Sequence, residues 1–265
     1  MTIGSVHDVA GAALAAIEVS AKVAAVRAAR AAWLDGQLTH GDGGEVLDPG
    51  ARGRPARPRL VPPRELRSRS LAGPEGRLAA IHAVAHIEAN AIDLAVDAVH
   101  RFRSMPPRFY DDWLRVAEEE CGHFELLRCR LHDLGSAYGD LPAHGGLWDA
   151  CASTADDPLR RMALVPRVLE ARGLDVNPAM RERFAAGGDH DTAAILDVIL
   201  RDEIGHVAVG DRWFKWLCAE RGLAPEVTFT RLLTDAEVVV RPPLNVEARR
   251  AAGFGDDELV ALAGG

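Results

Sequence analysis

Two short stretches decide how this sequence is interpreted: Glu120-Cys121-Gly122-His123 and Glu203-Ile204-Gly205-His206. Each places a carboxylate and an imidazole three residues apart, and residues at that spacing share one face of an α-helix. Each is also preceded by another glutamate in apolar surroundings, Glu88 before the first and Glu170 before the second, at separations of 32 and 33 residues. The repeated spacing indicates two equivalent halves of one site.

Two glutamates together with two Glu-x-x-His motifs, carried on four helices, make the ligand set of dinuclear metal centres in helical bundles. Four carboxylates and two imidazoles without a thiolate suit iron or manganese at least as well as zinc. We therefore expect two iron ions, with manganese or a mixed manganese–iron pair as alternatives. The candidate ligands are Glu88, Glu120, His123, Glu170, Glu203 and His206.

Three of these glutamates occupy positions where a core residue is expected. Glu88, for example, shares its helical face with Ile81, Ala85 and Ile92. An unpaired buried carboxylate is costly or takes up a proton, so such a position calls for a cation. The alternative is that the acids pair with arginines and the histidines are ordinary core residues. Glu170 fits that alternative best, because Arg167 lies on its face.

Composition limits the class of protein. A chain of 265 residues with a net charge of −8 can bury a large core and does not favour general binding to nucleic acids. Its four cysteines have no C-x-x-C spacing, which predicts reduced thiols. The apolar stretch 9–34 contains Glu18, Lys22, Arg27 and Arg30, so we expect neither a secretory signal nor a membrane span. These features predict a cytoplasmic protein without membrane contact.

The pattern along the chain predicts a mostly α fold, because no segment shows the alternation typical of strands. We expect two parts: residues 1–73, an N-terminal helix and an extended arm, and residues 74–265, a helical bundle with a C-terminal extension. The expected helices span residues 9–34, 74–103, 107–135, 158–172 with a kink at Pro166, a short helix after Pro178, 191–220 and 225–240. Residues 136–157 are expected to form a loop.

The segment 36–73 is rich in glycine, proline and arginine, which predicts an extended arm on the surface. Its arginines could contact a polyanion, but no aromatic residues are interleaved among them as stacking platforms. The simpler interpretation is a strap that pairs with an acidic body. Those arginines are Arg52, Arg54, Arg57, Arg59, Arg64, Arg67 and Arg69.

Three further residues are weaker candidates. His86 lies two residues before Glu88 and so points away from that glutamate on a helix, but it is kept as an additional ligand candidate. Tyr110 and Tyr138 are the only tyrosines in the sequence. Either could be a redox-active neighbour of a metal, with a core or loop role as the alternative.

Five stretches resemble the ferritin-like superfamily, and more closely a bacterial ferritin-like family known only as a domain of unknown function. Together they extend over roughly residues 60 to 255. They are residues 82–95 (HAVAHIEANAIDLA), 105–113 (MPPRFYDDW), 118–124 (EEECGHF), 161–175 (RMALVPRVLEARGLD) and 201–207 (RDEIGHV).

This resemblance implies a ferritin-like four-helix bundle with the N-terminal helix, the arm and short helices added. All six expected ligand positions are present. A ligating imidazole usually donates its second N–H to an acid. By analogy with related di-iron proteins, Asp202 would orient His123 and Glu119 would orient His206, although a surface salt bridge explains either acid equally well.

The resemblance does not select one activity, since a fold hosts many functions. The leading hypothesis is a non-haem di-iron oxidoreductase that uses O2 or peroxide to oxidise or hydroxylate a small-molecule substrate. The alternatives are an iron-handling or peroxide-detoxifying protein without an organic substrate, and a metal-bound interaction module. A modified RNA as substrate and a homodimer as assembly stay open.

Overall fold

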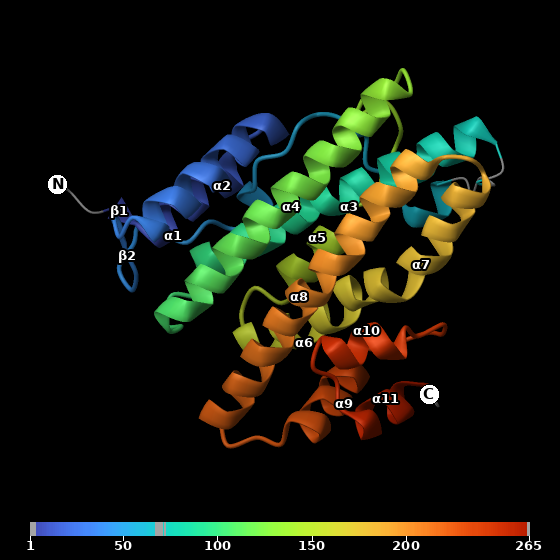
Figure 1. Cartoon of the computed structure of the whole chain (residues 1–265). Helices are drawn as coiled ribbons and strands as arrows, with labels where there is room; N and C mark the ends of the chain where they lie inside the picture. Colours follow the sequence, from blue (N-terminus) through green and yellow to red (C-terminus); the bar gives the residue numbers. More distant parts are fainter. Residues whose placement is uncertain (1–3, 67–70, 72, 264–265) are drawn as a thin grey trace. The chain divides into compact units, whose positions relative to one another are not determined.

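Helices dominate the computed structural model, which describes residues 4–66, 71 and 73–263 (Figure 1). The α-helices are α1 (Val6–Ala15), α2 (Val19–Leu34), α3 (Pro74–Arg101), α4 (Pro107–Asp133), α5 (Gly146–Ser153), α6 (Pro158–Leu164), α7 (Ala171–Ala186), α8 (His190–Glu220), α9 (Pro225–Asp235), α10 (Val246–Ala251) and α11 (Asp256–Ala263). The other elements are the 3-10 turns η1 (Pro49–Ala51) and η2 (Pro63–Glu65), the π-helix η3 (Val165–Glu170), and the parallel two-residue strands β1 (Gly4–Ser5) and β2 (Leu38–Thr39). The predicted all-α class is confirmed.

Contacts divide the chain after Ala152 into two compact units. The first unit contains α1 to α4 and most of α5, and the second contains α6 to α11. The segment before residue 73 therefore belongs to the same compact unit as α3 and α4. The boundary at residue 73 stays a prediction about domain organisation.

In the first unit, α3 and α4 lie side by side, with α1 packed against α3 and α2 against α4 (Figure 1). Pro107 occupies the first turn of α4. Backbone N–H groups there have no partner within the helix, so the N–H that proline lacks costs no hydrogen bond. The turn between the two long helices is closed by Tyr110, whose hydroxyl donates to Phe102 O and accepts from Met105 N, each at 3.1 Å. The long helices predicted for this region are confirmed to within two residues.

The expected single helix over residues 9–34 is wrong, because the chain leaves the helix between α1 and α2. Ala16 is extended there, and the sequence offers neither glycine nor proline as a signal. The arm supplies the reason: Gly53 N donates to Leu14 O at 3.0 Å, and Lys22 Nζ donates to the same oxygen at 3.3 Å. A Cβ on Gly53 would lie 2.2 Å from Ala15 O, so the arm approaches closely enough to end the helix.

The arm is extended, as predicted, but it is anchored to the body of the first unit. Arg52 binds Asp93 of α3 at 2.7 Å, and its guanidinium lies 4.2 Å from the centre of the Trp148 ring. Lys22 of α2 forms a second ion pair with the same buried aspartate. The pairing of Arg52 fits the strap interpretation of the arm. The predicted loop over residues 136–157 is partly wrong, since it contains α5.

In the second unit, the kink expected at Pro166 is instead the π-helix η3. Pro166 lies against α8 at Gly210, where an added Cβ would be 2.2 Å from the proline Cβ. The separate short helix expected after Pro178 is also wrong, because α7 runs continuously through that proline. The C-terminal helices are held by two buried arginines, Arg167 paired with Glu258 and Arg249 paired with Asp175.

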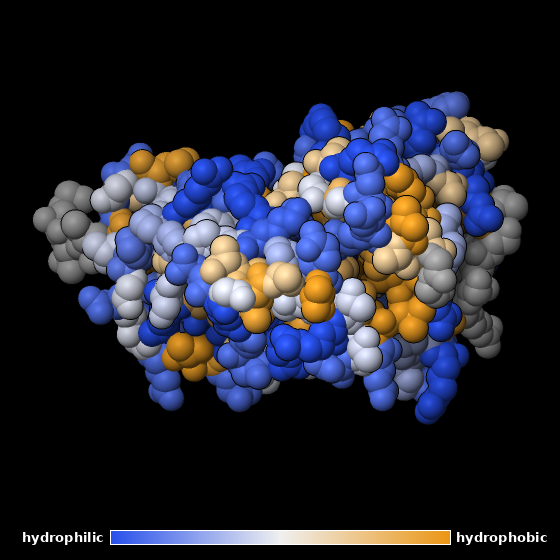
Figure 2. Space-filling model, turned by 90° about the horizontal axis from the view of Figure 1, so that it is seen from below, coloured by the Kyte–Doolittle hydropathy of each residue, from blue (hydrophilic) through white to orange (hydrophobic). Residues whose placement is uncertain are grey.

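Among the residues that the structure describes, no helix is both long enough and apolar enough to cross a membrane. The face drawn in Figure 2 is mostly hydrophilic, with apolar residues gathered in separate patches.

Candidate metal centre

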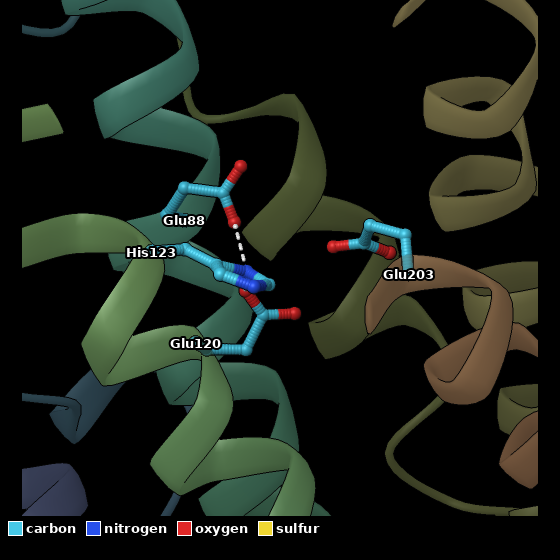
Figure 3. A group of neighbouring side chains, drawn as sticks. All are labelled: Glu88, Glu120, His123 and Glu203. Atoms are coloured by element: carbon cyan, nitrogen blue, oxygen red, sulfur yellow. Dashed lines mark hydrogen bonds and ion pairs between the residues drawn. The ribbon is translucent and has the colours of Figure 1, made fainter. Parts of the chain in front are cut away.

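Three predicted ligands come together inside the first unit. Glu88 projects from the middle of α3, and Glu120 and His123 project from α4, so that all three side chains point toward one another (Figure 3). Potential ligand atoms of the three lie within 4.8 Å of one another. His123 Nδ1 is 3.2 Å from Glu120 Oε2 and 3.5 Å from Glu88 Oε2. We call these residues the Glu88 cluster.

The helix geometry explains this convergence. Glu120 and His123 are three residues apart on α4 and therefore share a face, as the spacing predicted. Apolar side chains occupy the neighbouring positions on that face, including Val116 and Phe124, which are 1% and 2% exposed. Burial of this apolar face of α4 therefore places the side chains of Glu120 and His123 in the interior as well.

Burial makes the cluster electrostatically unusual. Glu120 is 0% exposed, His123 2% and Glu88 3%. Burial, followed by the nearby charge of Glu120, raises the pKa of Glu88 well above its ordinary value. Burial alone would lower the pKa of His123, but the hydrogen bonds and charges of Glu120 and Glu88 outweigh it and raise that pKa to about 11. Two carboxylates thus share one imidazole.

The donor set fits a metal ion. The contact of Glu88 Oε2 with His123 Nδ1, at 3.5 Å, is longer than a good hydrogen bond, so this oxygen is poorly satisfied by the protein. One imidazolium balances one ionised carboxylate, whereas a divalent cation would allow both Glu88 and Glu120 to be ionised. Carboxylate and imidazole donors are those that iron, manganese and zinc bind. The buried Glu88 cluster could therefore hold a metal ion.

The second unit carries the other three predicted ligands. Glu203 and His206 lie three residues apart on α8, with Glu203 Oε1 3.6 Å from His206 Nδ1. Both side chains are buried. Glu170 is the last residue of η3 and is half-buried. This geometry repeats the Glu-x-x-His arrangement of α4, but it does not test whether the three residues bind a metal.

The two acids predicted to orient the histidines lie beside arginines of their own helices. Glu119 accepts two hydrogen bonds from Arg115, each at 2.8 Å, one turn earlier on α4. Asp202 accepts from the neighbouring Arg201 at 2.9 Å. These contacts match the salt-bridge alternative for both acids. The orienting roles of Glu119 and Asp202 stay predictions.

The two tyrosines occupy very different places in the first unit. Tyr110 binds the main chain at the α3–α4 turn, ten residues from Glu120 on α4, or about 15 Å along the helix axis. Tyr138 packs edge-on against Phe124, with ring centres 5.1 Å apart, and its hydroxyl lies 2.9 Å from His86 Nδ1. Tyr138 is therefore the better placed of the two for a redox role, which stays a prediction.

His86 belongs to a polar group on the opposite face of α3 from Glu88. Residues two apart on a helix differ by about 200°, so His86 and Asn90 both point away from the Glu88 cluster. Asn90 Nδ2 donates to His86 O at 2.6 Å, and Arg52 donates to Asn90 Oδ1 at 2.9 Å. His86 was expected as a ligand candidate, but its partners Asn90 and Arg52 were not predicted, although polar residues at 82, 86, 90 and 93 share one face of a helix.

An uncharacterized protein from Haemophilus influenzae is 47% identical to this chain over 213 residues, a match that covers 77% of this chain and 74% of the relative. No solved structure is significantly similar. A family model described as "Protein of unknown function (DUF455)" matches residues 15–260, and the chain belongs to that family.

Proposed function

We propose that this protein is a non-haem dinuclear metal oxidoreductase that uses O2 or peroxide to oxidise or hydroxylate an organic substrate. The observation that carries the proposal is the buried Glu88 cluster, in which two carboxylates face a single imidazole. A chain gains no stability from such an excess of buried acid, so the arrangement is best explained by a cation that the cluster binds.

Each Glu-x-x-His motif, together with its upstream glutamate, would hold one metal ion. Glu88, Glu120 and His123 would hold one ion, and the matching residues Glu170, Glu203 and His206 would hold the second. In each set, the two glutamates would supply carboxylate oxygens and the histidine an imidazole nitrogen. The repeated spacing of the two motifs supports this assignment. We also propose that the protein belongs to the ferritin-like superfamily. Its four-helix bundle would be built from α3, α4, the α6–η3–α7 segment and α8.

When bound there, two ferrous ions would supply electrons for the reduction of O2 or peroxide, and thereby the oxidising power for the substrate. The protein contributes a fixed set of oxygen and nitrogen donors on rigid helices. It also contributes a water-poor interior: Val116, Ala117 and Leu127, neighbours of the ligands on α4, are all at most 1% exposed. Such surroundings strengthen charge interactions with the metal and protect a reactive centre from water.

Metal analysis of protein purified without chelators tests the proposal. We expect about two metal ions per chain, mostly iron, with binding coupled to the fully folded protein. A content below about one metal ion per two chains, both as purified and after anaerobic incubation with ferrous iron, would contradict the proposal.

Histidine variants test the ligand assignment. His123→Ala and His206→Ala should each lower the metal content while the helical circular dichroism signal stays largely unchanged, because the apolar faces of α4 and α8 remain. His132→Ala is a matched control, since this histidine is exposed near the end of the same helix α4. An unchanged metal content in the His123→Ala/His206→Ala double variant would refute the assignment.

Single-turnover oxidation of the ferrous protein then tests the reaction type. Consumption of O2 or peroxide with oxidation of a co-purified organic molecule supports the oxidoreductase. Rapid oxidation that leaves only ferric iron and no organic product would instead support iron handling or peroxide removal.

A further inference from the structure

A surface hollow in the first unit lies between the start of α2, the arm and the end of α4, and its volume is about 640 Å³. This volume lies within the range of small-molecule sites. None of its lining residues belongs to the Glu88 cluster. They are Glu18, Val19, Ser20, Val23, Pro55, Ala56, Arg57, Phe124, Glu125, Arg128, His132, Ser136, Ala137 and Tyr138.

Cationic side chains from two separate segments line this hollow. These are Arg57 from the arm and Arg128 on α4; the polar ring of His132 lies one turn after Arg128. Within the described part of the chain, neither guanidinium forms an ion pair or hydrogen bond with a carboxylate. All three side chains are exposed and therefore available to a ligand.

The acids of the hollow do not cancel this charge. Glu125 is already occupied, since Arg27 donates to both of its oxygens, at 2.5 Å and 3.4 Å. The lining itself holds two glutamates and two arginines. Because Arg27 balances Glu125, only Glu18 is left facing Arg57 and Arg128, which leaves one positive charge in excess around the hollow. The whole chain carries −8, which makes a positive concave surface unusual for this protein.

The remaining walls are largely apolar. Val19, Val23 and Pro55 line one side, and Phe124 and Tyr138 bring two aromatic rings that contact each other edge-on. Phe124 lies one helical turn from Glu120 on α4. The apolar part of a bound ligand would lie against these walls, while its charged group would face the arginines.

We propose that this hollow binds a small organic anion, with its carboxylate or phosphate group held by Arg57 and Arg128 and its apolar body against Val23 and Phe124. The planar guanidinium matches carboxylate and phosphate oxygens and forms charge-assisted hydrogen bonds with them. The apolar walls add affinity that an inorganic anion cannot gain. None of the residues of this site is a proposed metal ligand, so anion binding here can be tested independently of the metal centre.

Isothermal titration calorimetry of the full chain with 1-naphthyl phosphate tests the proposal, since this probe combines a phosphate with a flat apolar body. We expect saturable binding that weakens as salt is added. Inorganic phosphate, which lacks the body, and 1-naphthol, which lacks the charge, should each bind much more weakly. The titrations are made with metal-loaded and with chelator-treated protein, so that loss of the metal centre cannot be confused with loss of this site.

Arginine variants locate the binding. Arg57→Gln and Arg128→Gln should each weaken binding of 1-naphthyl phosphate by about tenfold, the effect of losing one charge-assisted hydrogen-bonding group. Arg59→Gln is the matched control, because this exposed arginine lies on the same arm but does not line the hollow. Thermal melting confirms that the variants fold.

Three results would overturn the proposal: no saturable binding of 1-naphthyl phosphate, equal binding of inorganic phosphate, or equal losses in Arg57→Gln and Arg59→Gln. An affinity that does not change with salt would also contradict it, because the arginines would then not carry the interaction.

Discussion

Glu88 is the residue whose position is hardest to explain by stability alone. Its carboxyl group is buried on α3, one of its oxygens has only a long 3.5 Å contact with His123, and burial together with Glu120 raises its pKa. Glu120 already has His123 at 3.2 Å as a partner. Glu88 is therefore the surplus acid of the cluster when no metal is bound.

A neutral replacement tests this at the level of one side chain. Glu88→Gln keeps the shape of the side chain but removes a carboxyl group whose raised folded-state pKa costs stability above its ordinary pKa, so chelator-treated protein should become more stable by about 1–3 kcal/mol. The same variant should lose metal. Urea unfolding at pH 7 measures the first effect, and elemental analysis measures the second.

Glu75→Gln is a suitable control, because Glu75 is exposed in the first turn of the same helix. A Glu88→Gln protein that is less stable than the wild type without metal, yet keeps its metal, would show that Glu88 is a structural residue.

At the scale of single elements, the π-helix η3 depends on a close approach between two helices. Pro166 lies against Gly210 of α8, and a Cβ at residue 210 would be 2.2 Å from Pro166 Cβ and 2.3 Å from its Cγ. Atoms do not approach so closely, so only glycine at 210 admits the proline. Proline also lacks the N–H that a regular helix needs, which favours an irregular turn at η3.

Two glycine substitutions on α8 should therefore have opposite effects. Gly210→Ala should destabilise the protein by about 1–3 kcal/mol, because the new methyl group overlaps with Pro166. Gly205→Ala should stabilise it by about 0.5–1 kcal/mol, because nothing lies within 4 Å of a Cβ there and alanine favours helix. Chemical denaturation distinguishes them, and equal effects of the two substitutions would disprove the close contact.

Asp157 caps helix α6, and its effect on stability should depend on pH. Burial would raise its pKa, but hydrogen bonds from Arg221 and from Leu159 N outweigh this and lower it. Because the pKa of Asp157 is lower in the folded protein than in the unfolded chain, its charge stabilises the folded state at pH values above the ordinary pKa of 3.8. This stabilisation is lost as the pH falls through the folded-state pKa. Asp157→Asn keeps a capping oxygen and loses only the charge.

Asp157→Asn should thus be less stable than the wild type by about 1 kcal/mol at pH 7, and the difference should vanish in strong acid. Thermal melting from pH 7 down to pH 2 measures this. A difference that stays constant over the whole pH range would show that the charge of Asp157 contributes nothing.

At the scale of the whole chain, a long-range ion-pair group ties the arm and α2 to the first unit. Asp93 is 4% exposed on α3, and it pairs with Lys22 and with Arg52, which lie 71 and 41 residues earlier in the sequence. Without this aspartate, two cations would remain in a buried place with no countercharge.

Asp93→Asn should therefore destabilise the protein by about 3 kcal/mol and release the arm. Limited trypsin digestion of the folded protein should then cut rapidly after Arg52, a site that resists cleavage in the wild type; the Arg54–Pro55 bond is not a trypsin site. Asp156→Asn, which removes an exposed aspartate paired with Arg160, should leave the digestion pattern unchanged. Equal resistance of the Asp93→Asn protein would exclude this anchoring role.

The helical class, the long helices α3, α4 and α8, and the pairing of Glu120 with His123 could all be predicted from the amino-acid sequence. All of these follow from local periodicity and from spacing along one helix, so no distant residue is needed to predict them. The grouping of Glu88 with Glu120 could also be expected, because both lie on apolar faces that must be buried.

Four features follow from packing between distant segments and could not be predicted from local sequence. The chain leaves the helix between α1 and α2, η3 is a π-helix, Asp93 anchors the arm, and Arg57 and Arg128 line one hollow. Each of these features depends on residues that are far apart in sequence: Gly53 with Leu14, Gly210 with Pro166, and Asp93 with Arg52. Local sequence patterns contain no information about such contacts, because these arise only when separate segments pack together.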